Sequence, residues 1–464
     1  MPKPTELERY TAHLCDALGH ADRHAGLVDY CRGLMLPIER KSVEPLAAHI
    51  NPFQVSAKHQ SLHHFVAKAD WSDELVLARV RDWVLPRMNL EGGAFWIIDD
   101  TGCPKKGKHS VGVARQYCGQ LGKQDNCQVA VSLSVATEHA SLPVIYRLYL
   151  PDEWAQDEGR RAKAGVPEEM KFQTKPQIAL EQVRQAKAAG LAAGPVLADA
   201  GYGTDTSFRE GLTDLSLTYC VGVQPGINVW ALGAEPLPAK PRQKRGRPPT
   251  RLRRAPGHQP MSVKALAQEL GTAAWRTIMW REGSAGKMRS RFAAVRVRAA
   301  HRDENRSRLR EEEWLLIEWP ASEAAPTKYW LSTLPAKTSL AELVRTTKMR
   351  WRIERDYQEL KQEFGLDHYE GRGWRGFHHH ATLCIAAYGF LAAQRLAPGG
   401  VKKKPARPEA SILPADYTPR GGRANAAART RFDCHVAILD CSEDLAKLTA
   451  LPELRTGQAL FVTQ

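Results

Sequence analysis

Two short apolar segments that end in acidic residues constrain the fold of this chain more than any other feature. The segment AFWIIDD (residues 94–100) ends in Asp99 and Asp100, and in GPVLADAGYG (194–203) the apolar run ends at Asp199 and is followed by two glycines. Short, uninterrupted apolar runs are typical of strands buried on both faces of a sheet. We therefore predict two buried strands, each with a carboxylate at its carboxyl end.

The segments between these two strands predict how the strands are arranged. Residues 127–136 and 142–151 alternate apolar and polar side chains, as strands do, whereas residues 175–191 have the apolar spacing of a helix. In the order strand, strand, strand, helix, strand, the first and fourth strands are commonly parallel neighbours. We expect an α/β fold with a mixed sheet, and the two terminal acids side by side at one end of it.

A third acid lies in a helix predicted over residues 349–366. Apolar residues form one stripe of this helix, and Arg350, Glu354 and Lys361 follow a second, narrow stripe beside it. The stripe is either a salt-bridged surface or an acid held in place for chemistry. As a surface, the pair between Arg350 and Glu354 would contribute only about 0.3–0.5 kcal/mol.

Three acids at one end of a sheet favour a divalent metal site. Clustered carboxylates repel one another and lose hydration, so they persist where divalent cations neutralise them. Two Mg²⁺ ions held in this way can activate a water or a 3′-hydroxyl and stabilise the leaving oxygen. The expected reaction is in-line phosphoryl transfer.

Composition points to a polyanionic partner. Lys and Arg number 66 against 51 Asp and Glu, a net charge of +15 over 464 residues. No apolar run approaches the ~20 residues of a membrane span, and the first residues lack the apolar segment of a signal peptide. The 9 cysteines include no C-x-x-C pair, which argues against a zinc site and for reduced thiols. We expect a cytoplasmic protein.

Three other segments carry weaker signals. Residues 1–90 have helical spacing and form either a packing domain or a DNA-binding domain. Residues 239–260 contain eight Lys and Arg, five Pro and no acid, and are either a solvated loop or a clamp on DNA phosphate. The histidines of GFHHHATL (376–383) point in three directions on a helix, so we predict surface or DNA-contact residues rather than metal ligands. The candidate DNA contacts in the basic loop are Lys244, Arg245, Arg247, Arg253 and Arg254.

From about residue 20 to about residue 395, the sequence resembles bacterial insertion-sequence transposases of the DDE class, which have an RNase H-like catalytic core. The most specific element is the signature Tyr-x2-Arg-x3-Glu-x6-Lys. Arg350, Glu354 and Lys361 match its last three members, whereas Thr347 stands where the Tyr belongs. The motif IDDTG matches the first-acid motif of the family, in which the acid before Thr is catalytic, and so selects Asp100.

The resemblance implies specific roles for the matched residues. Asp100, Asp199 and Glu354 would be catalytic and would hold two Mg²⁺ ions, for which Mn²⁺ can substitute. Arg350 and Lys361 would bind DNA phosphate. Trp330 is the best-placed candidate for trapping a flipped base, and its alternative role is packing in the core.

The implied activity is cleavage at terminal inverted repeats and joining of 3′-hydroxyl ends to target DNA. The partner would be double-stranded DNA, bound by a homodimer that associates with the bacterial nucleoid. One rival is an RNase H-like nuclease that does not join strands, and another is an inactive DNA-binding relative. A glycosidase could also use paired carboxylates, but the basic charge disfavours it.

These observations predict a helical N-terminal domain and an RNase H-like mixed-sheet core, interrupted by an inserted β-rich domain before the last catalytic helix. The predicted boundaries are 1–90 for the helical domain, 91–222 for the first part of the core, 223–335 for the insertion with its basic loop at 239–260, 336–398 for the catalytic helix and completion of the core, and 399–464 for a tail of unknown role.

Overall fold

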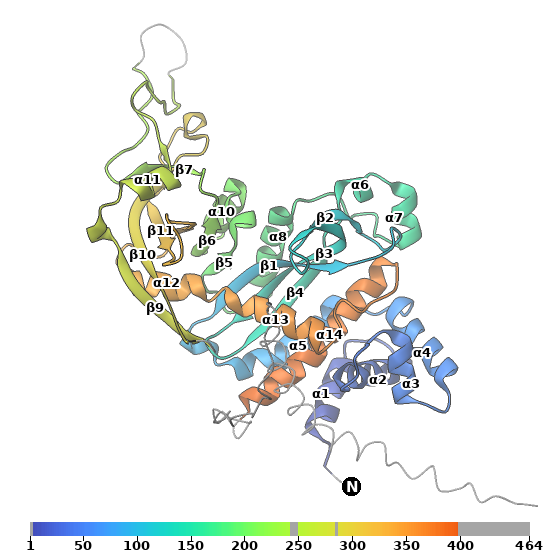
Figure 1. Cartoon of the computed structure of the whole chain (residues 1–464). Coiled ribbons are helices and arrows are strands. Elements are labelled where there is room, and N and C mark those ends of the chain that lie inside the picture. The colour runs from blue at the N-terminus through green and yellow to red at the C-terminus, as the bar shows by residue number, and fades with distance from the viewer. Residues whose placement is uncertain (1–2, 242–248, 284–285, 398–464) are drawn as a thin grey trace, which may run out of the picture. The chain divides into compact units, whose positions relative to one another are not determined.

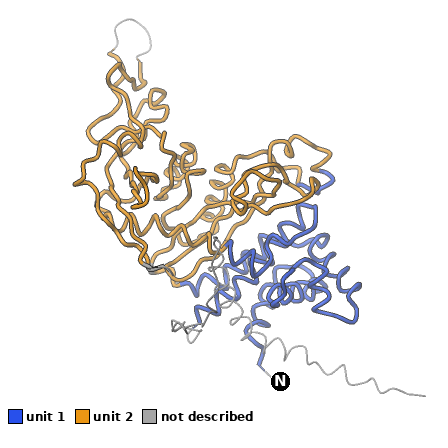
Figure 2. Tube along the Cα trace, viewed as in Figure 1, with its two compact units in different colours: residues 1–88, 162–166, 357–464 blue, residues 89–161, 167–356 orange. Residues whose placement is uncertain are grey.

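The computed structural model describes residues 3–241, 249–283 and 286–397. The chain forms two compact units (Figure 2). Among the described residues, unit 1 combines 3–88 and 162–166 with 357–397, and unit 2 consists of 89–161 and of the described part of 167–356.

Unit 1 is helical. Five helices form its N-terminal part, and a long helix, α14 (Trp374–Leu396), contacts three of them, α2, α4 and α5. Helix α14 is buried on every side from Gly376 to Ala393, as expected for an apolar helix at the centre of a bundle. The N-terminal helices are α1 (Glu6–Cys15), α2 (His24–Met35), α3 (Val43–Ile50), α4 (Val55–Ala67) and α5 (Asp73–Val84).

The prediction of surface or DNA-contact histidines in α14 is wrong, because His378, His379 and His380 are all buried. The His379 ring stacks on Trp71 at a centroid distance of 3.6 Å. The His380 Nδ1 atom lies 2.9 Å from the hydroxyl of Tyr30. Three consecutive positions do point in three directions, but on a helix surrounded by protein each direction is buried.

The sheet of unit 2 confirms the predicted arrangement of its first strands (Figure 1). Strand β1 (Phe95–Pro104) pairs antiparallel with β3 (Lys123–Ala136) and parallel with β5 (Val196–Ala198). Strand β4 (Ser141–Leu148) pairs antiparallel with β3. A short strand that the sequence analysis missed, β2 (Ala114–Cys118), extends the edge beyond β3.

The strands predicted as an insertion continue the same sheet. Strand β6 (Tyr219–Val223) pairs parallel with β5 and antiparallel with β12 (Lys328–Ser332). From β12 the sheet runs on through β11, β10, β7 and β8, with β9 also paired to β10. The added strands are β7 (Asn228–Ala231), β8 (Met261–Ser262), β9 (Arg276–Gly283), β10 (Gly286–Ala299) and β11 (Glu313–Trp319).

The helix predicted over 349–366 is shorter and follows a separate helix. Helix α12 (Leu340–Lys348) precedes α13 (Trp351–Gln362), and the chain passes from one to the other through Met349 and Arg350. The apolar stripe is buried as predicted, with Ile353 and Leu360 fully inaccessible. The remaining helices are α6 (Asp152–Ala155), α7 (Glu158–Ala164), α8 (Lys175–Ala188), α9 (Ala200–Gly203), α10 (Thr206–Asp214) and α11 (Val263–Glu269).

No helix in the described part of the chain combines the length and apolar character needed to cross a membrane.

Candidate active site

Asp199 directly follows β5, as predicted. The prediction that the first strand ends at its acids is wrong, because β1 continues to Pro104 and stays paired with β3, so Asp99 and Asp100 lie within the strand. The parallel register pairs Ile97 with Leu197, so two residues further on Asp99 and Asp199 occupy equivalent positions on the same side of their strands. Asp199 also caps α9, because its Oδ1 atom accepts a hydrogen bond of 2.8 Å from the backbone N–H of Gly201.

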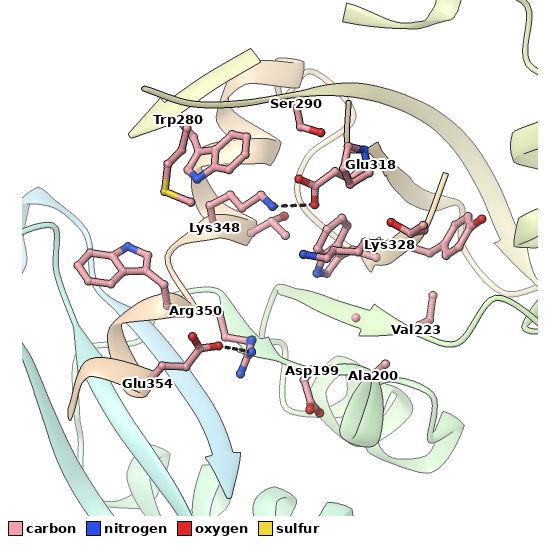
Figure 3. Close-up of a pocket in the computed structure, with 18 of the residues that line it drawn as sticks. Asp199, Ala200, Val223, Trp280, Ser290, Glu318, Lys328, Lys348, Arg350 and Glu354 are labelled. Atoms are coloured by element: carbon pink, nitrogen blue, oxygen red, sulfur yellow. Dashed lines mark hydrogen bonds and ion pairs between the residues drawn. The ribbon is translucent and has the colours of Figure 1, made fainter. Parts of the chain in front are cut away.

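Arg350 brings the third acid to this point. One guanidinium nitrogen, Nη1, lies 2.6 Å from Oδ2 of Asp99, and the other, Nη2, lies 2.6 Å from Oε1 of Glu354. Figure 3 shows the side chain of Arg350 between those of Glu354 and Asp199. The i,i+4 ion pair of the surface interpretation is therefore present, and the same guanidinium also holds a carboxylate of the central sheet.

The carboxyl group of Asp99 is in an environment that resists negative charge. Burial raises the pKa of Asp99 to about 7, and the negative charges of Asp199 and Asp100 add to the rise, whereas Arg350 opposes it. The side chain of Asp99 is only 15% exposed, against 59% for Glu354. The guanidinium of Arg350 is therefore the neighbour that favours the charged form of Asp99.

Asp100, the first acid selected by the family motif, has other partners. Successive residues of a strand face opposite sides, and the Oδ2 atom of Asp100 accepts hydrogen bonds from Nζ of Lys175 at 3.0 Å and from the hydroxyl of Tyr202 at 3.1 Å. These contacts connect β1 to the start of α8 and to α9. The role of Asp100 as a metal ligand stays a prediction. The acid of β1 that shares Arg350 with Glu354 is Asp99.

The chemistry of the donor set fits a hard divalent cation. Carboxylate oxygens are the donors that Mg²⁺ prefers, and two of the acids, Asp99 and Glu354, already hold a guanidinium whose side chain is only 26% exposed. In the conformation seen here, no three His, Cys, Asp or Glu side chains of the described residues stand close enough together to hold a metal ion. A metal site built from these acids would need them to come closer together, and Arg350 now lies between two of them.

A pocket of about 720 Å³ opens beside the acids (Figure 3). Asp199, Arg350 and Glu354 line one part of it, and the aromatic side chains of Trp280, Tyr329, Trp330 and Trp351 line other parts. Trp330 is thus on the pocket wall, and it also packs partly against the core cluster around Phe292. Both roles weighed for Trp330 from the sequence are compatible with this position.

Sequence reasoning missed a buried ion pair in the pocket wall. Nζ of Lys348 lies 2.7 Å from Oε2 of Glu318, and the two side chains are 16% and 4% exposed. The ammonium group also lies 4.4 Å from the ring centroid of Trp280 and 5.3 Å from that of Trp330. The available signal was Glu318 itself, a single acid following the apolar run of its strand, since buried carboxylates are rare unless paired.

The rest of the signature is distributed over two helices. Lys361 lies in the last turn of α13, seven residues after Glu354, which is about 10 Å along a helix axis. Thr347 lies on α12 and is buried, where its hydroxyl donates to the carbonyl of Leu343 at 2.7 Å and lies 2.7 Å from Sγ of Cys220. Thr347 is therefore held inside the protein by its neighbours on α12 and β6.

The predicted DNA contacts of the basic loop are only partly visible. Lys244, Arg245 and Arg247 lie outside the described residues. Arg253 donates from Nε to the carbonyl of Pro238 at 3.1 Å. Arg254 forms ion pairs with Asp303 and Glu304 at 2.7 and 3.3 Å, so part of its charge is neutralised within the protein.

Comparison with known proteins places these observations in a family. The sequence pattern of the DDE superfamily endonucleases matches residues 13–287, a range that includes β1 and β5 with their acids and ends before α13. A protein of Microchaete diplosiphon described as "Probable transposase for insertion sequence element IS701" is 31% identical over 194 residues, which are 41% of this chain. The chain spans 47% of the length of that relative in the alignment. On the family match, which covers more than half of the sequence, this chain belongs to the DDE superfamily endonucleases.

Proposed function

We propose that this protein is the DNA transposase of an insertion sequence. The observation that carries the proposal is the guanidinium of Arg350, which holds Asp99 of β1 and Glu354 of α13 and lines an open pocket together with Asp199. The similarity to a probable insertion-sequence transposase supports it. The reaction would be cleavage at terminal inverted repeats and transfer of 3′-hydroxyl ends into target DNA.

The side chains of the site would have different roles in phosphoryl transfer. Two Mg²⁺ ions, or Mn²⁺ in their place, supply activation of the attacking oxygen and stabilisation of the leaving oxygen when they are bound. Asp199, Glu354 and an acid of β1 would hold them. Arg350 and Lys361 would orient the DNA phosphate at the cleavage point, and Trp330 would receive a base displaced from the stack.

The acid of β1 is either Asp99 or Asp100, and two variants separate these candidates. The family motif selects Asp100, whereas the register with Asp199 and the contact with Arg350 favour Asp99. We expect Asp99→Asn to abolish cleavage, because it removes a carboxylate charge next to Asp199. Asp100→Asn should retain measurable cleavage, since Asp100 contacts Lys175 and Tyr202. An inactive Asp100→Asn beside an active Asp99→Asn would restore the assignment made from the motif.

Several finer features belong to the same proposal. The first strands of unit 2, with α13, would be an RNase H-like core, and the strands after β6 would be the elaboration inserted before the last acid. The N-terminal helices would bind DNA. The active species would be a homodimer on double-stranded DNA in the bacterial cytoplasm, associated with the nucleoid.

The decisive experiment is incubation of the full chain with donor DNA that carries the ends of its own element, with and without Mg²⁺. We expect cut and joined products only with the metal. Nicked products without joining would indicate the rival nuclease, and binding without cutting would indicate an inactive DNA-binding relative.

A further inference from the structure

The guanidinium of Arg350 occupies the space between the acids where a cation is needed. Its two terminal nitrogens are used on two different carboxylates, Asp99 and Glu354, both at 2.6 Å. A single positive charge therefore neutralises acids from β1 and from α13 at once. Because the planar guanidinium bonds both carboxylates through separate nitrogens, its position and its orientation are both fixed.

The position of Arg350 in the chain allows the guanidinium to leave. Arg350 lies between α12, which ends at Lys348, and α13, which begins at Trp351. It also lines the open pocket next to the acids, and one of its partners, Glu354, is 59% exposed. A phosphate entering the pocket could take the guanidinium from Glu354 without displacing a buried group.

We propose that Arg350 is an internal counter-cation that keeps the divalent-metal site closed until a DNA phosphate draws the guanidinium away from Asp99 and Glu354. This inference rests on the proposed function, because it assigns the metal to the same acids. Arg350 then has two successive partners, carboxylates in the free protein and phosphate in the complex. DNA binding and metal binding become coupled, so metal would be held firmly only on a bound substrate.

Coupling of this kind is reciprocal and can be measured without any turnover. If DNA tightens metal binding by some factor, metal must tighten DNA binding by the same factor. The protein's Kd for Mn²⁺ is measured by isothermal titration calorimetry, alone and with a duplex that carries the end of its element and a non-hydrolysable linkage at the cleavage site. The wild-type protein should bind Mn²⁺ at least about fivefold more tightly in the complex.

The informative variant is Arg350→Gln, which keeps a polar side chain but removes the charge. Without DNA, Arg350→Gln should bind Mn²⁺ at least about fivefold more tightly than the wild-type protein, and DNA should add little further tightening. The matched control is Arg345→Gln on α12, which also removes one positive charge. Arg345 pairs with Glu138 at the surface, and its side chain is 62% exposed. This control should behave as the wild-type protein does.

Two results would overturn the inference. One is a wild-type protein that binds Mn²⁺ equally well with and without DNA, and the other is an Arg350→Gln protein that binds Mn²⁺ no more tightly than the wild-type protein. If circular dichroism shows that Arg350→Gln does not fold, Arg350→Lys takes its place. The ammonium group of the introduced lysine cannot hold two carboxylates through separate terminal nitrogens. Without DNA, the Kd of Arg350→Lys for Mn²⁺ should therefore still fall below the wild-type value, and an unchanged Kd counts against the inference.

Failure of the proposed function gives a different pattern. In that case the wild-type protein does not cut donor DNA, and Asp199→Asn leaves Mn²⁺ binding unchanged. If only the closing role of Arg350 is wrong, the wild-type protein cuts DNA and Asp199→Asn lowers Mn²⁺ affinity, yet Arg350→Gln has the wild-type Kd in the absence of DNA.

Discussion

Replacing Lys348 with Met should destabilise unit 2 strongly, although Lys348 is outside the group of acids. The change leaves the carboxylate of Glu318, which is 4% exposed, without its partner at 2.7 Å. Removal of one member of a buried ion pair costs about 3–5 kcal/mol, because a buried charge is left uncompensated. Loss of the ammonium contacts with the rings of Trp280 and Trp330 adds to this cost.

The free energy of unfolding can be measured by urea denaturation followed through tryptophan fluorescence, since two tryptophans surround the ammonium group. We expect Lys348→Met to lose about 3 kcal/mol or more. The double variant Lys348→Met with Glu318→Leu should recover at least about 2 kcal/mol of this loss, because it leaves no unpaired charge. The control Arg345→Met breaks an exposed pair with Glu138, whose side chains are 62% and 56% exposed, and should cost at most about 1 kcal/mol.

A loss below about 1 kcal/mol for Lys348→Met would refute the reasoning, because that is the cost of breaking a solvent-exposed pair. A double variant that is as unstable as Lys348→Met would also refute it. The carboxylate of Glu318 would then not be the source of the cost, and packing of the Lys348 side chain would have to account for it.

Four further predictions concern Glu354, Lys361, the basic loop and His379 of unit 1. Glu354→Gln should be inactive in a DNA-cleavage assay at any Mg²⁺ or Mn²⁺ concentration while DNA binding persists, because the amide cannot replace the charge that holds a hard cation; full activity would remove Glu354 from the site. Lys361→Ala should be slow but measurable in the same assay, with a loss on the order of a hundredfold if it misplaces the DNA end by about 1 Å. Replacing Arg242, Lys244, Arg245, Arg247 and Arg251 with Gln should flatten the dependence of log affinity for DNA on log salt concentration, since fewer counterions are released; an unchanged slope would identify a solvated loop. Burial lowers the pKa of His379 to about 4, although the carbonyls of Trp71 and Val66 oppose the shift; its stabilising contribution is therefore complete above the ordinary pKa of about 6.5 and is lost as the pH falls toward 4. The free energy of unfolding should fall less over that range in His379→Gln than in the wild-type protein, and equal falls would contradict the assignment.

Local sequence patterns were sufficient for the elements that position the acids. The alternation of residues 127–136 and the apolar runs before Asp99 and Asp199 predicted β3, β1 and β5, and their order predicted the parallel pairing of β1 with β5 that the structure has. The spacing of Ile353 and Leu360 predicted which side of α13 is buried. These features depend on side-chain periodicity and on the order of the elements, and both can be read from the sequence alone.

The sequence determined that three acids come from β1, β5 and α13, but only the tertiary structure decided which neighbours each acid has. Asp99 and Asp100 face opposite sides of one strand, and periodicity cannot tell which side α13 will cover. The same limit explains the histidines of α14, whose burial depends on helices packed around them, and the pair of Lys348 with Glu318, whose members are 30 residues apart. Pairing between distant residues depends on how whole elements pack, and no pattern within one element contains that information.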